Sequence, residues 1–294
     1  MDRSEEMVGQ TNNLSHIGVV GAGTMGAGIA QVAAQSGYKL ILYDISHEIV
    51  AGAREKISYF IRRLGEKGRI SAEEAEAAIA RITATTSLGD MGATQFIIEA
   101  APERLDLKKQ IFEELERIVS PAAVLATNTS TLSVTQIGAA TASPERVVGM
   151  HFFNPPPLMP LVEVVAGAAT DPDVVDATVE VAKSLGKKPV RVKDVPGFIV
   201  NRVARPFHLE GLRLLEQGVA DIATIDRLIR EGGGFRMGPF ELQDLIGIDI
   251  NYAASQSVYE AYHHAPRFRP SLLQRQQVES GKLGKKTGRG WYEY

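Results

Sequence analysis

The chain has 294 residues, of which 44% are apolar and 23% are charged, and it contains no cysteine. This is ordinary globular composition with enough length for two domains, and it excludes disulfides, thiolate chemistry and a cysteine-ligated metal. The 32 basic and 35 acidic residues give a net charge of −3 and form no basic block, which argues against a nucleic-acid partner.

The N-terminal residues 1–13 are polar, and we expect a flexible tail there rather than a signal peptide. No later run of apolar residues reaches membrane-spanning length. We therefore expect a cytoplasmic protein without a membrane association, and we expect no metal site.

A βαβ unit follows the tail. Its parts are the strand "HIGVV", the glycine-rich helix start "GAGTMGAGIAQVAAQSG" and the strand "YKLILYD". A helical stretch from about Glu48 to Leu64 then breaks at "GEKGR" and resumes at Ser71, where "SAEE" fits a capping box with Glu74. These two segments predict a helical hairpin inserted into the domain.

Strands and helices continue to alternate up to residue 194. The predicted strands are "RITATT", "QFIIEA", "AVLATN", "RVVGMHFF", "LVEVV" and "KPVRV", with helices near 106–118 and 173–185. This alternation predicts an α/β domain with a doubly wound, mainly parallel sheet. From residue 195 onward the pattern is helical with almost no strands, so we place one domain over 14–194 and an all-α domain over 195–294.

The motif "GAGTMG" predicts a dinucleotide site. It places Gly21, Gly23 and Gly26 in G-x-G-x-x-G between an apolar strand and a helix of small residues. The first glycine permits a tight turn, the second lets a pyrophosphate approach the backbone, and the third lets helix and strand pack closely. The phosphates would face the helix N-terminus, where Thr24 and Met25 lie.

Asp44 ends the next strand and indicates which dinucleotide is bound. A carboxylate there accepts hydrogen bonds from the ribose hydroxyls and repels a 2′-phosphate, which favours NAD over NADP. A glycine-rich turn in which Asp44 merely starts a loop is the plain alternative. FAD is a weaker competitor because it uses the same motif.

An ionisable pair interrupts the apolar stretch "GMHFFNPPPLMPLVEVV". His151 suits a general base, and Glu163 on an adjacent strand would fix its tautomer and stabilise the imidazolium. Taken singly, a core histidine and an edge glutamate are the more common interpretation. Asn128 and Ser130 in "ATNTSTLS" and Asn201 in "GFIVNR" favour a site, because ligands collect beyond the carboxyl ends of strands in such sheets.

Several motifs in order resemble the L-3-hydroxyacyl-CoA dehydrogenase family, of the 3-hydroxybutyryl-CoA dehydrogenase type. The resemblance runs from Ser15 to Tyr294 and rests on "VVGAGTMGAGIAQ", "IIEAAPERLDLKKQIF", "NTSTLS", "GMHFFNPPPLMPLVEVV", "PGFIVNR", "MGPFELQDLIGID" and "LGKKTGRGWYEY". It implies a Rossmann-like NAD-binding domain followed by a helical substrate domain through which the chain forms a homodimer.

The resemblance also implies residue roles. His151 would be the general base with Glu163 as its partner, while Ser130 and Asn201 would hydrogen-bond the substrate oxygen. Asn154 in "HFFNP" would help to shape the substrate site, and Asn128 would lie on the cofactor side.

Other matched positions would contact the larger ligands. Glu103 and Lys108 in "PERLDLK" resemble residues that meet the nicotinamide-side ribose of NAD, although the residues alone would suggest surface helix charges. Lys67 in "GEKGR" lies where relatives meet CoA, and a solvated lysine is the alternative. The chain departs from many relatives at Pro160, where they carry a lysine, and at Thr131, where they carry a serine.

The expected reaction is NAD-dependent, reversible oxidation of an (S)-3-hydroxyacyl-CoA, first of all 3-hydroxybutyryl-CoA, in fatty acid β-oxidation or related acyl-CoA metabolism. Arg202 and Arg205 in "NRVARP" resemble relatives from phenylacetate breakdown that act on 3-hydroxyadipyl-CoA, but a structural or interface charge is the more common interpretation. A non-catalytic, crystallin-like NAD-binding relative is a further alternative. A β-hydroxyacid or sugar-acid dehydrogenase is disfavoured because those enzymes commonly use a lysine base in the second domain.

Overall fold

The computed structural model describes residues 14–294, so the tail expected over residues 1–13 lies outside the described residues. The chain divides into two compact units, one up to Val195 and one from Pro196 to Tyr294. No helix between residues 14 and 294 combines the length and the hydropathy that crossing a membrane requires.

The first unit is built on one eight-stranded sheet with the strand order β3-β2-β1-β4-β5-β6-β7-β8. All neighbouring strands pair in parallel except β6 and β7, which are antiparallel. The prediction of a doubly wound, mainly parallel sheet is therefore confirmed. The strands are β1 (His16–Val20), β2 (Lys39–Tyr43), β3 (Ile82–Thr85), β4 (Phe96–Glu99), β5 (Val124–Thr127), β6 (Val147–Phe152), β7 (Leu161–Ala166) and β8 (Lys188–Lys193).

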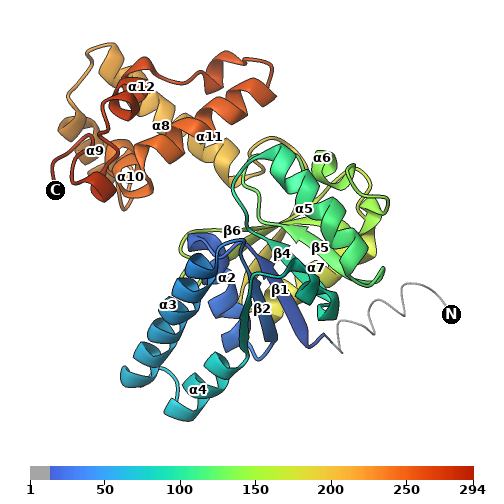
Figure 1. Cartoon of the computed structure of the whole chain (residues 1–294). Coiled ribbons are helices and arrows are strands. Elements are labelled where there is room, and N and C mark those ends of the chain that lie inside the picture. The colour runs from blue at the N-terminus through green and yellow to red at the C-terminus, as the bar shows by residue number, and fades with distance from the viewer. Residues whose placement is uncertain (1–13) are drawn as a thin grey trace. The chain divides into compact units, whose positions relative to one another are not determined.

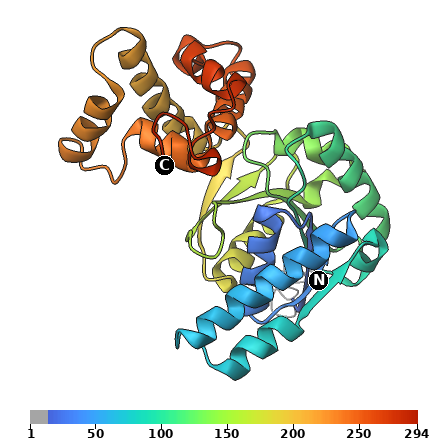
Figure 2. The ribbon, with the colours of Figure 1, turned by 60° about the vertical axis from the view of Figure 1, so that its left-hand side comes forward.

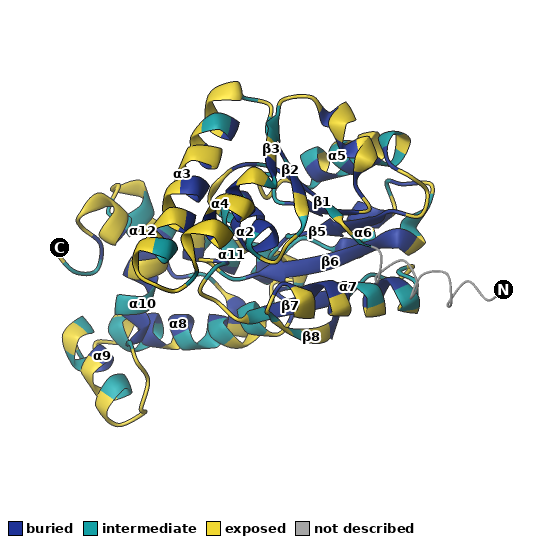
Figure 3. Ribbon diagram, turned by 90° about the horizontal axis from the view of Figure 1, so that it is seen from below, coloured by how far each residue is buried: buried dark blue, intermediate teal, exposed yellow. Residues whose placement is uncertain are grey.

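Helices cover both faces of this sheet, which explains why its central strands are mostly apolar. On one face α2 (Thr24–Gln35) and α7 (Pro172–Ser184) bury side chains such as Ile29 and Val179 against the strands. On the other face lie α5 (Leu105–Ile118) and α6 (Val134–Gly138) (Figure 1). Figure 3 shows β6 buried along its whole length, so any ionisable side chain on it lies in the interior.

The predicted helical hairpin consists of α3 (His47–Glu66) and α4 (Ala72–Ala80), which lie side by side (Figure 2). The capping box is present: Glu74 N donates to Ser71 Oγ at 3.0 Å, and Ser71 N donates to Glu74 Oε2 at 2.7 Å. An ion pair of 2.7 Å between Arg62 and Glu76 joins the two helices. At its start α3 is one residue longer than predicted, because Ser46 caps it.

The second unit is helical around a small apolar core of Leu209, Leu212, Ile225 and Phe240. Its final residues are held by Asp244, whose carboxylate accepts from the backbone N–H groups of residues 291 and 292 at 2.9 Å each. The helices are α8 (Val200–Glu216), α9 (Ile222–Glu231), α10 (Pro239–Ile246), α11 (Ile248–Ala261) and α12 (Leu272–Glu279).

Candidate active site

The glycine loop between β1 and α2 has the shape that a dinucleotide requires. Gly21 has a φ of +99°, and a Cβ there would lie 2.7 Å from Ala100 O. A Cβ at Gly26 would lie 1.7 Å from Gly21 O, so helix and loop are in close contact. A Cβ at Gly23 would meet nothing within 4 Å. The backbone is therefore open at the second glycine, directly before α2 begins at Thr24, and it fits a pyrophosphate at the helix N-terminus.

Asp44 follows β2 and supports this loop as well as presenting a charge. Its Oδ2 accepts from Ala22 N at 2.8 Å, and its Oδ1 accepts from Ser46 N at 3.3 Å. The bond to Ala22 is a feature that the sequence did not indicate. Each carboxylate oxygen has more than one lone pair, so the half-buried group can still accept ribose hydroxyls.

The structure brings His151 and Glu163 together. They are register partners on β6 and β7, and Nδ1 of the histidine lies 2.8 Å from Oε2 of the glutamate. Both residues are buried, with 6% and 1% of their surface exposed. An ionised carboxylate can only accept, so Nδ1 carries the proton of the neutral imidazole and Nε2 is the nitrogen that would accept a proton.

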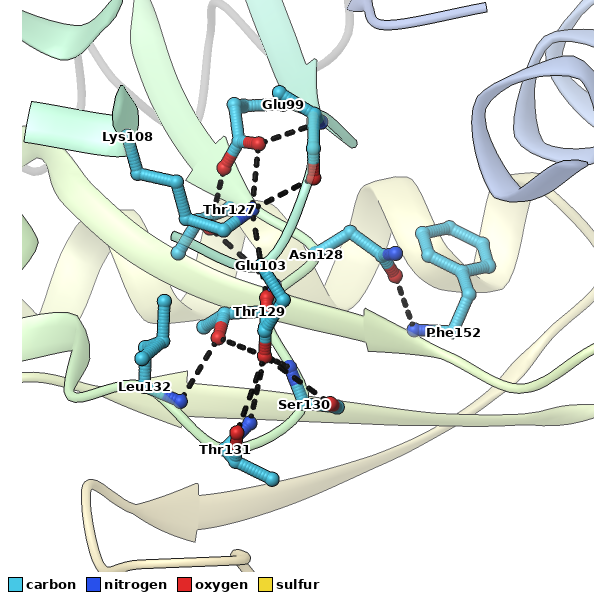
Figure 4. Close-up of polar contacts among 11 residues, drawn as sticks. Glu99, Glu103, Lys108, Thr127, Asn128, Thr129, Ser130, Thr131, Leu132 and Phe152 are labelled. Carbon is cyan, nitrogen blue, oxygen red and sulfur yellow. Dashed lines mark hydrogen bonds and ion pairs between the residues drawn. The ribbon is translucent and has the colours of Figure 1, made fainter. Parts of the chain in front are cut away.

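Ser130 lies in a loop after β5 that Glu103 holds (Figure 4). Oε1 of this glutamate accepts from Ser130 N at 2.8 Å and Oγ at 3.1 Å, from Thr129 Oγ1 at 2.8 Å and from Thr131 N at 3.0 Å. Burial alone would raise the pKa of Glu103, but the charge of Lys108 and these hydrogen bonds outweigh burial and lower the pKa.

Asn128 connects the same loop to the strand that carries the histidine. Its side-chain Oδ1 accepts from Phe152 N at 2.8 Å, next to His151, and its own N–H donates to Glu99 O at 2.7 Å. We expected Asn128 on the cofactor side, and these contacts add a structural role to that expectation. The loop and the histidine strand are therefore tied by a direct hydrogen bond.

Lys108 is not a surface helix charge, because only 1% of its surface is exposed. Its Nζ donates to Glu99 Oε1 at 2.6 Å and to Ala101 O at 3.2 Å, and lies 3.6 Å from Glu103 Oε2. Glu99 is not among the residues that the sequence motifs predict for the site. It interrupts the apolar strand "QFIIEA" as Glu163 interrupts "LVEVV", so the same signal could have identified it.

A groove of about 560 Å³ lies between α2, α3 and the proline-rich segment 154–158. Asn154 and Lys67, which we predicted in the substrate site, both line it. Its walls are largely apolar and its cations come from α3 and the residue after it, a combination that suits a ligand with a flexible chain and phosphates. The apolar and cationic side chains are Ile57, Phe60, Leu64, Pro156, Lys56, Arg63 and Lys67.

In the second unit, Asn201 lies in the first turn of α8. The guanidinium of Arg202 packs 5.1 Å from the centre of the Tyr262 ring. Arg205 is 3% exposed and its Nη1 donates to Asn251 O at 2.8 Å. Burial lowers the pKa of Arg205 to about 10. These contacts favour the structural interpretation of both arginines.

Within the first unit, the candidate groups gather at one edge of the sheet. The glycine loop follows β1, Asp44 follows β2, Glu99 ends β4, Asn128 follows β5 and His151 lies near the end of β6. These five strands run in the same direction. Their carboxyl ends therefore share the edge at which doubly wound sheets bind ligands.

Comparison with known proteins gives two domain matches. The model described as 3-hydroxyacyl-CoA dehydrogenase, NAD binding domain, matches residues 16–195, and that for the C-terminal domain matches residues 197–294. The chain is 47% identical to 3-hydroxyadipyl-CoA dehydrogenase of Escherichia coli, over 96% of this chain but only 59% of that protein. It is 39% identical to 3-hydroxybutyryl-CoA dehydrogenase of Mycobacterium tuberculosis, over 96% and 99% of the two chains.

Solved structures agree with these matches. A 3-hydroxybutyryl-CoA dehydrogenase from E. coli superposes with a TM-score of 0.93 at 47% identity, covering 96% of this chain and 60% of that one. An (S)-3-hydroxybutyryl-CoA dehydrogenase from Ralstonia eutropha superposes with a TM-score of 0.92 at 40% identity, covering 96% and 99%.

Proposed function

The chain belongs to the 3-hydroxyacyl-CoA dehydrogenase family, and from this premise we propose that it reversibly oxidises an (S)-3-hydroxyacyl-CoA to the 3-oxoacyl-CoA. Its first unit is an NAD-binding domain. The observation that carries the proposal is the buried pair of His151 and Glu163 at the carboxyl edge of the sheet. This pair is a general base with its orienting carboxylate, which alcohol oxidation needs.

When bound, NAD supplies the acceptor for the hydride that leaves C3 of the substrate. His151 accepts the hydroxyl proton at Nε2, and Glu163 keeps the Nδ1 proton in place and stabilises the imidazolium that forms. We propose that Ser130 and Asn201 hydrogen-bond the substrate oxygen. Glu103 and Lys108 would lie toward the nicotinamide-side ribose, and Asp44 toward the adenosine ribose.

We propose that the groove between α2, α3 and segment 154–158 holds the CoA part of the substrate. Its apolar walls suit the pantetheine chain, while Lys67 would attract the phosphates. Asn154 also lines the groove and would help to orient the chain. Lys67 is exposed, so its side chain would be free to move toward a phosphate.

The acyl group that we propose is 3-hydroxybutyryl. A second candidate is 3-hydroxyadipyl, favoured by the 47% identity to the E. coli enzyme of that name. The buried backbone contact of Arg205 argues against direct pairing of this residue with a terminal carboxylate. Comparing kcat/KM for the two thioesters shows which acyl group is preferred. Equal values would exclude an arginine that binds the terminal carboxylate of the substrate.

The test of the reaction is formation of NADH from 3-hydroxybutyryl-CoA by the purified protein. His151→Ala should lower kcat on the order of a hundredfold or more, because the general base is lost. His47→Ala, which removes an exposed histidine at the start of α3, is the matched control and should keep the wild-type rate. Binding of NAD without turnover of any 3-hydroxyacyl-CoA would instead support a crystallin-like relative.

We also propose a homodimer formed through the C-terminal unit, as the resemblance of the motifs implies, and a cytoplasmic location, which the similarity to bacterial 3-hydroxybutyryl-CoA dehydrogenases supports. Fatty acid β-oxidation or related acyl-CoA metabolism is the corresponding setting. Sedimentation of the purified chain measures the first of these proposals directly. A monomer at assay concentration would contradict it.

A further inference from the structure

The two carboxylate oxygens of Glu103 have different surroundings. Oε1 accepts hydrogen bonds from three consecutive residues of the loop 129–131. Oε2 accepts none from residues 14–294, and the nearest cation is Lys108 Nζ at 3.6 Å. The side chain is 36% exposed. One oxygen therefore holds the loop, while the other remains an acceptor that a ligand hydroxyl can reach.

Lys108 Nζ lies 3.6 Å from that acceptor, but its closer partner is Glu99. Glu99 Oε1 lies 2.6 Å from the ammonium, and both side chains are buried, with 0% and 1% exposed. Glu99 is itself fixed, because Ala101 N donates to Oε1 and Thr127 Oγ1 donates to Oε2, each at 2.7 Å (Figure 4). The counter-charge of Lys108 is thus held in place by two hydrogen bonds of its own.

We propose that Glu99 is a positioning residue that holds Lys108 back from Glu103, so that Glu103 Oε2 stays open to accept a ribose hydroxyl of NAD. This inference rests on the proposed function, because it assigns the open oxygen to the cofactor. Glu99 acts only through Lys108 and touches neither cofactor nor substrate.

The charge balance gives the physical reason. The cluster contains two carboxylates and one ammonium, so Lys108 can neutralise only one of them. With Glu99 as its close partner, the second carboxylate keeps its accepting capacity. Without the charge of Glu99, the buried ammonium has Glu103 as its only counter-charge in the cluster and is drawn to it. A ribose hydroxyl would then compete with an ammonium for the same oxygen.

Glu99→Gln tests this, because it keeps the shape of the side chain and removes its charge. The dissociation constant for NAD, measured by calorimetry, and the KM for NAD should each rise on the order of tenfold, the effect expected for weakening a hydrogen bond to a charged acceptor. The kcat at saturating NAD and the KM for acyl-CoA should stay within about twofold of wild type. An unchanged dissociation constant in Glu99→Gln would overturn the proposal.

Glu99→Asp separates charge from structural support. The shorter side chain loses contacts and should lower Tm more than Glu99→Gln does, yet it keeps the charge. We therefore expect NAD affinity to fall in the order wild type, Glu99→Asp, Glu99→Gln. A purely structural role would make NAD affinity follow Tm, and Glu99→Gln would then bind NAD more tightly than Glu99→Asp. If the Gln variant does not fold, an Asp variant with near wild-type affinity and lowered Tm supports the proposal, and a tenfold loss contradicts it.

Glu116→Gln is the matched control. Glu116 also holds a loop, accepting from Ala142 N at 2.8 Å and Ser143 N at 2.9 Å, but it lies outside the Glu99 cluster. This variant should lose stability without a change in NAD affinity. Failure of the proposed function can be told apart from failure of the role of Glu99. A wild-type chain that binds no NAD contradicts the proposed function. If the wild-type chain binds NAD without turnover, the NAD affinities of the Glu99 variants still test the role of Glu99.

Discussion

At the scale of single residues, the charge of Glu163 determines which nitrogen of His151 can accept a proton. We predict that Glu163→Gln lowers kcat by roughly a hundredfold. The amide NH₂ can donate to Nδ1, which favours the tautomer with its proton on Nε2, the nitrogen that must accept the substrate proton. The same variant also removes the charge that stabilises the imidazolium. Steady-state kinetics with 3-hydroxybutyryl-CoA and NAD measure the effect.

The matched control for Glu163→Gln is Glu180→Gln. Glu180 forms an exposed ion pair with Lys183 on α7, and an exposed pair contributes little. This control should keep the wild-type kcat and KM. A Glu163→Gln enzyme whose kcat stays within about twofold of wild type would show that the carboxylate does not set the tautomer.

Residue patterns predicted some of these groups and missed others for a physical reason. His151 and Glu163 were identifiable because an ionisable side chain in an apolar strand requires a buried partner. Glu99 carries the same signal, but its partner Lys108 lies on a helix in which charged residues are common. No sequence pattern indicates the hydrogen bond from Ala22 N to Asp44, since it depends on how two loops meet at the sheet edge.

At the scale of elements, Glu103 makes the loop 129–131 sensitive to acid. The pKa of this carboxyl is lowered below its ordinary value of 4.5, so it binds protons less readily in the folded state. Its contribution to stability is therefore fully present above that ordinary value and is lost as pH falls through the lower, folded-state pKa. Glu103→Gln should lower the free energy of unfolding at pH 7 by at most about 1 kcal/mol, because solvent screens a partly exposed group.

Urea unfolding of the ligand-free protein measures this contribution. The difference between wild type and Glu103→Gln should be largest at neutral pH and should be smaller at an acidic pH below the folded-state pKa of Glu103, where the carboxyl is protonated. Asp176→Asn is the control, because Asp176 forms an exposed ion pair with Arg191. A Glu103 difference that is equal at both pH values would mean that shape, not charge, holds the loop.

The proline-rich segment 154–158 depends on a lysine outside the groove that it lines. Lys187 Nζ donates to Pro156 O at 2.5 Å and to Met159 O at 3.1 Å, and its burial lowers its pKa. Lys187→Met keeps the length of the side chain and removes both hydrogen bonds. We predict that the KM for acyl-CoA rises about three- to tenfold while the KM for NAD is unchanged. Lys188→Met, at the exposed neighbouring position, should change neither, and equal effects of the two variants would contradict this role.

At the scale of the whole molecule, the alternation of strands and helices was sufficient to predict the α/β unit and the helical unit that follows. The strand order was not predictable in the same way, because it depends on which strands pair after the chain crosses the sheet. The antiparallel pairing of β6 and β7 was implied only by the short proline turn between them. In the second unit, Asp244 accepts hydrogen bonds from the backbone of residues 291 and 292. These positions are too far apart in sequence for a local pattern to predict the contact.

The division into two units with separate cores has a thermodynamic consequence for cofactor binding. The NAD-binding motifs belong to the first unit, whereas the single tryptophan, Trp291, belongs to the second. A ligand that binds the folded form stabilises the unit that holds it, by about 2.7 kcal/mol at a concentration of one hundred times its dissociation constant. We predict that NAD raises the calorimetric transition of the first unit more than the midpoint followed by tryptophan fluorescence. An equal shift of both would show that the two units unfold as one.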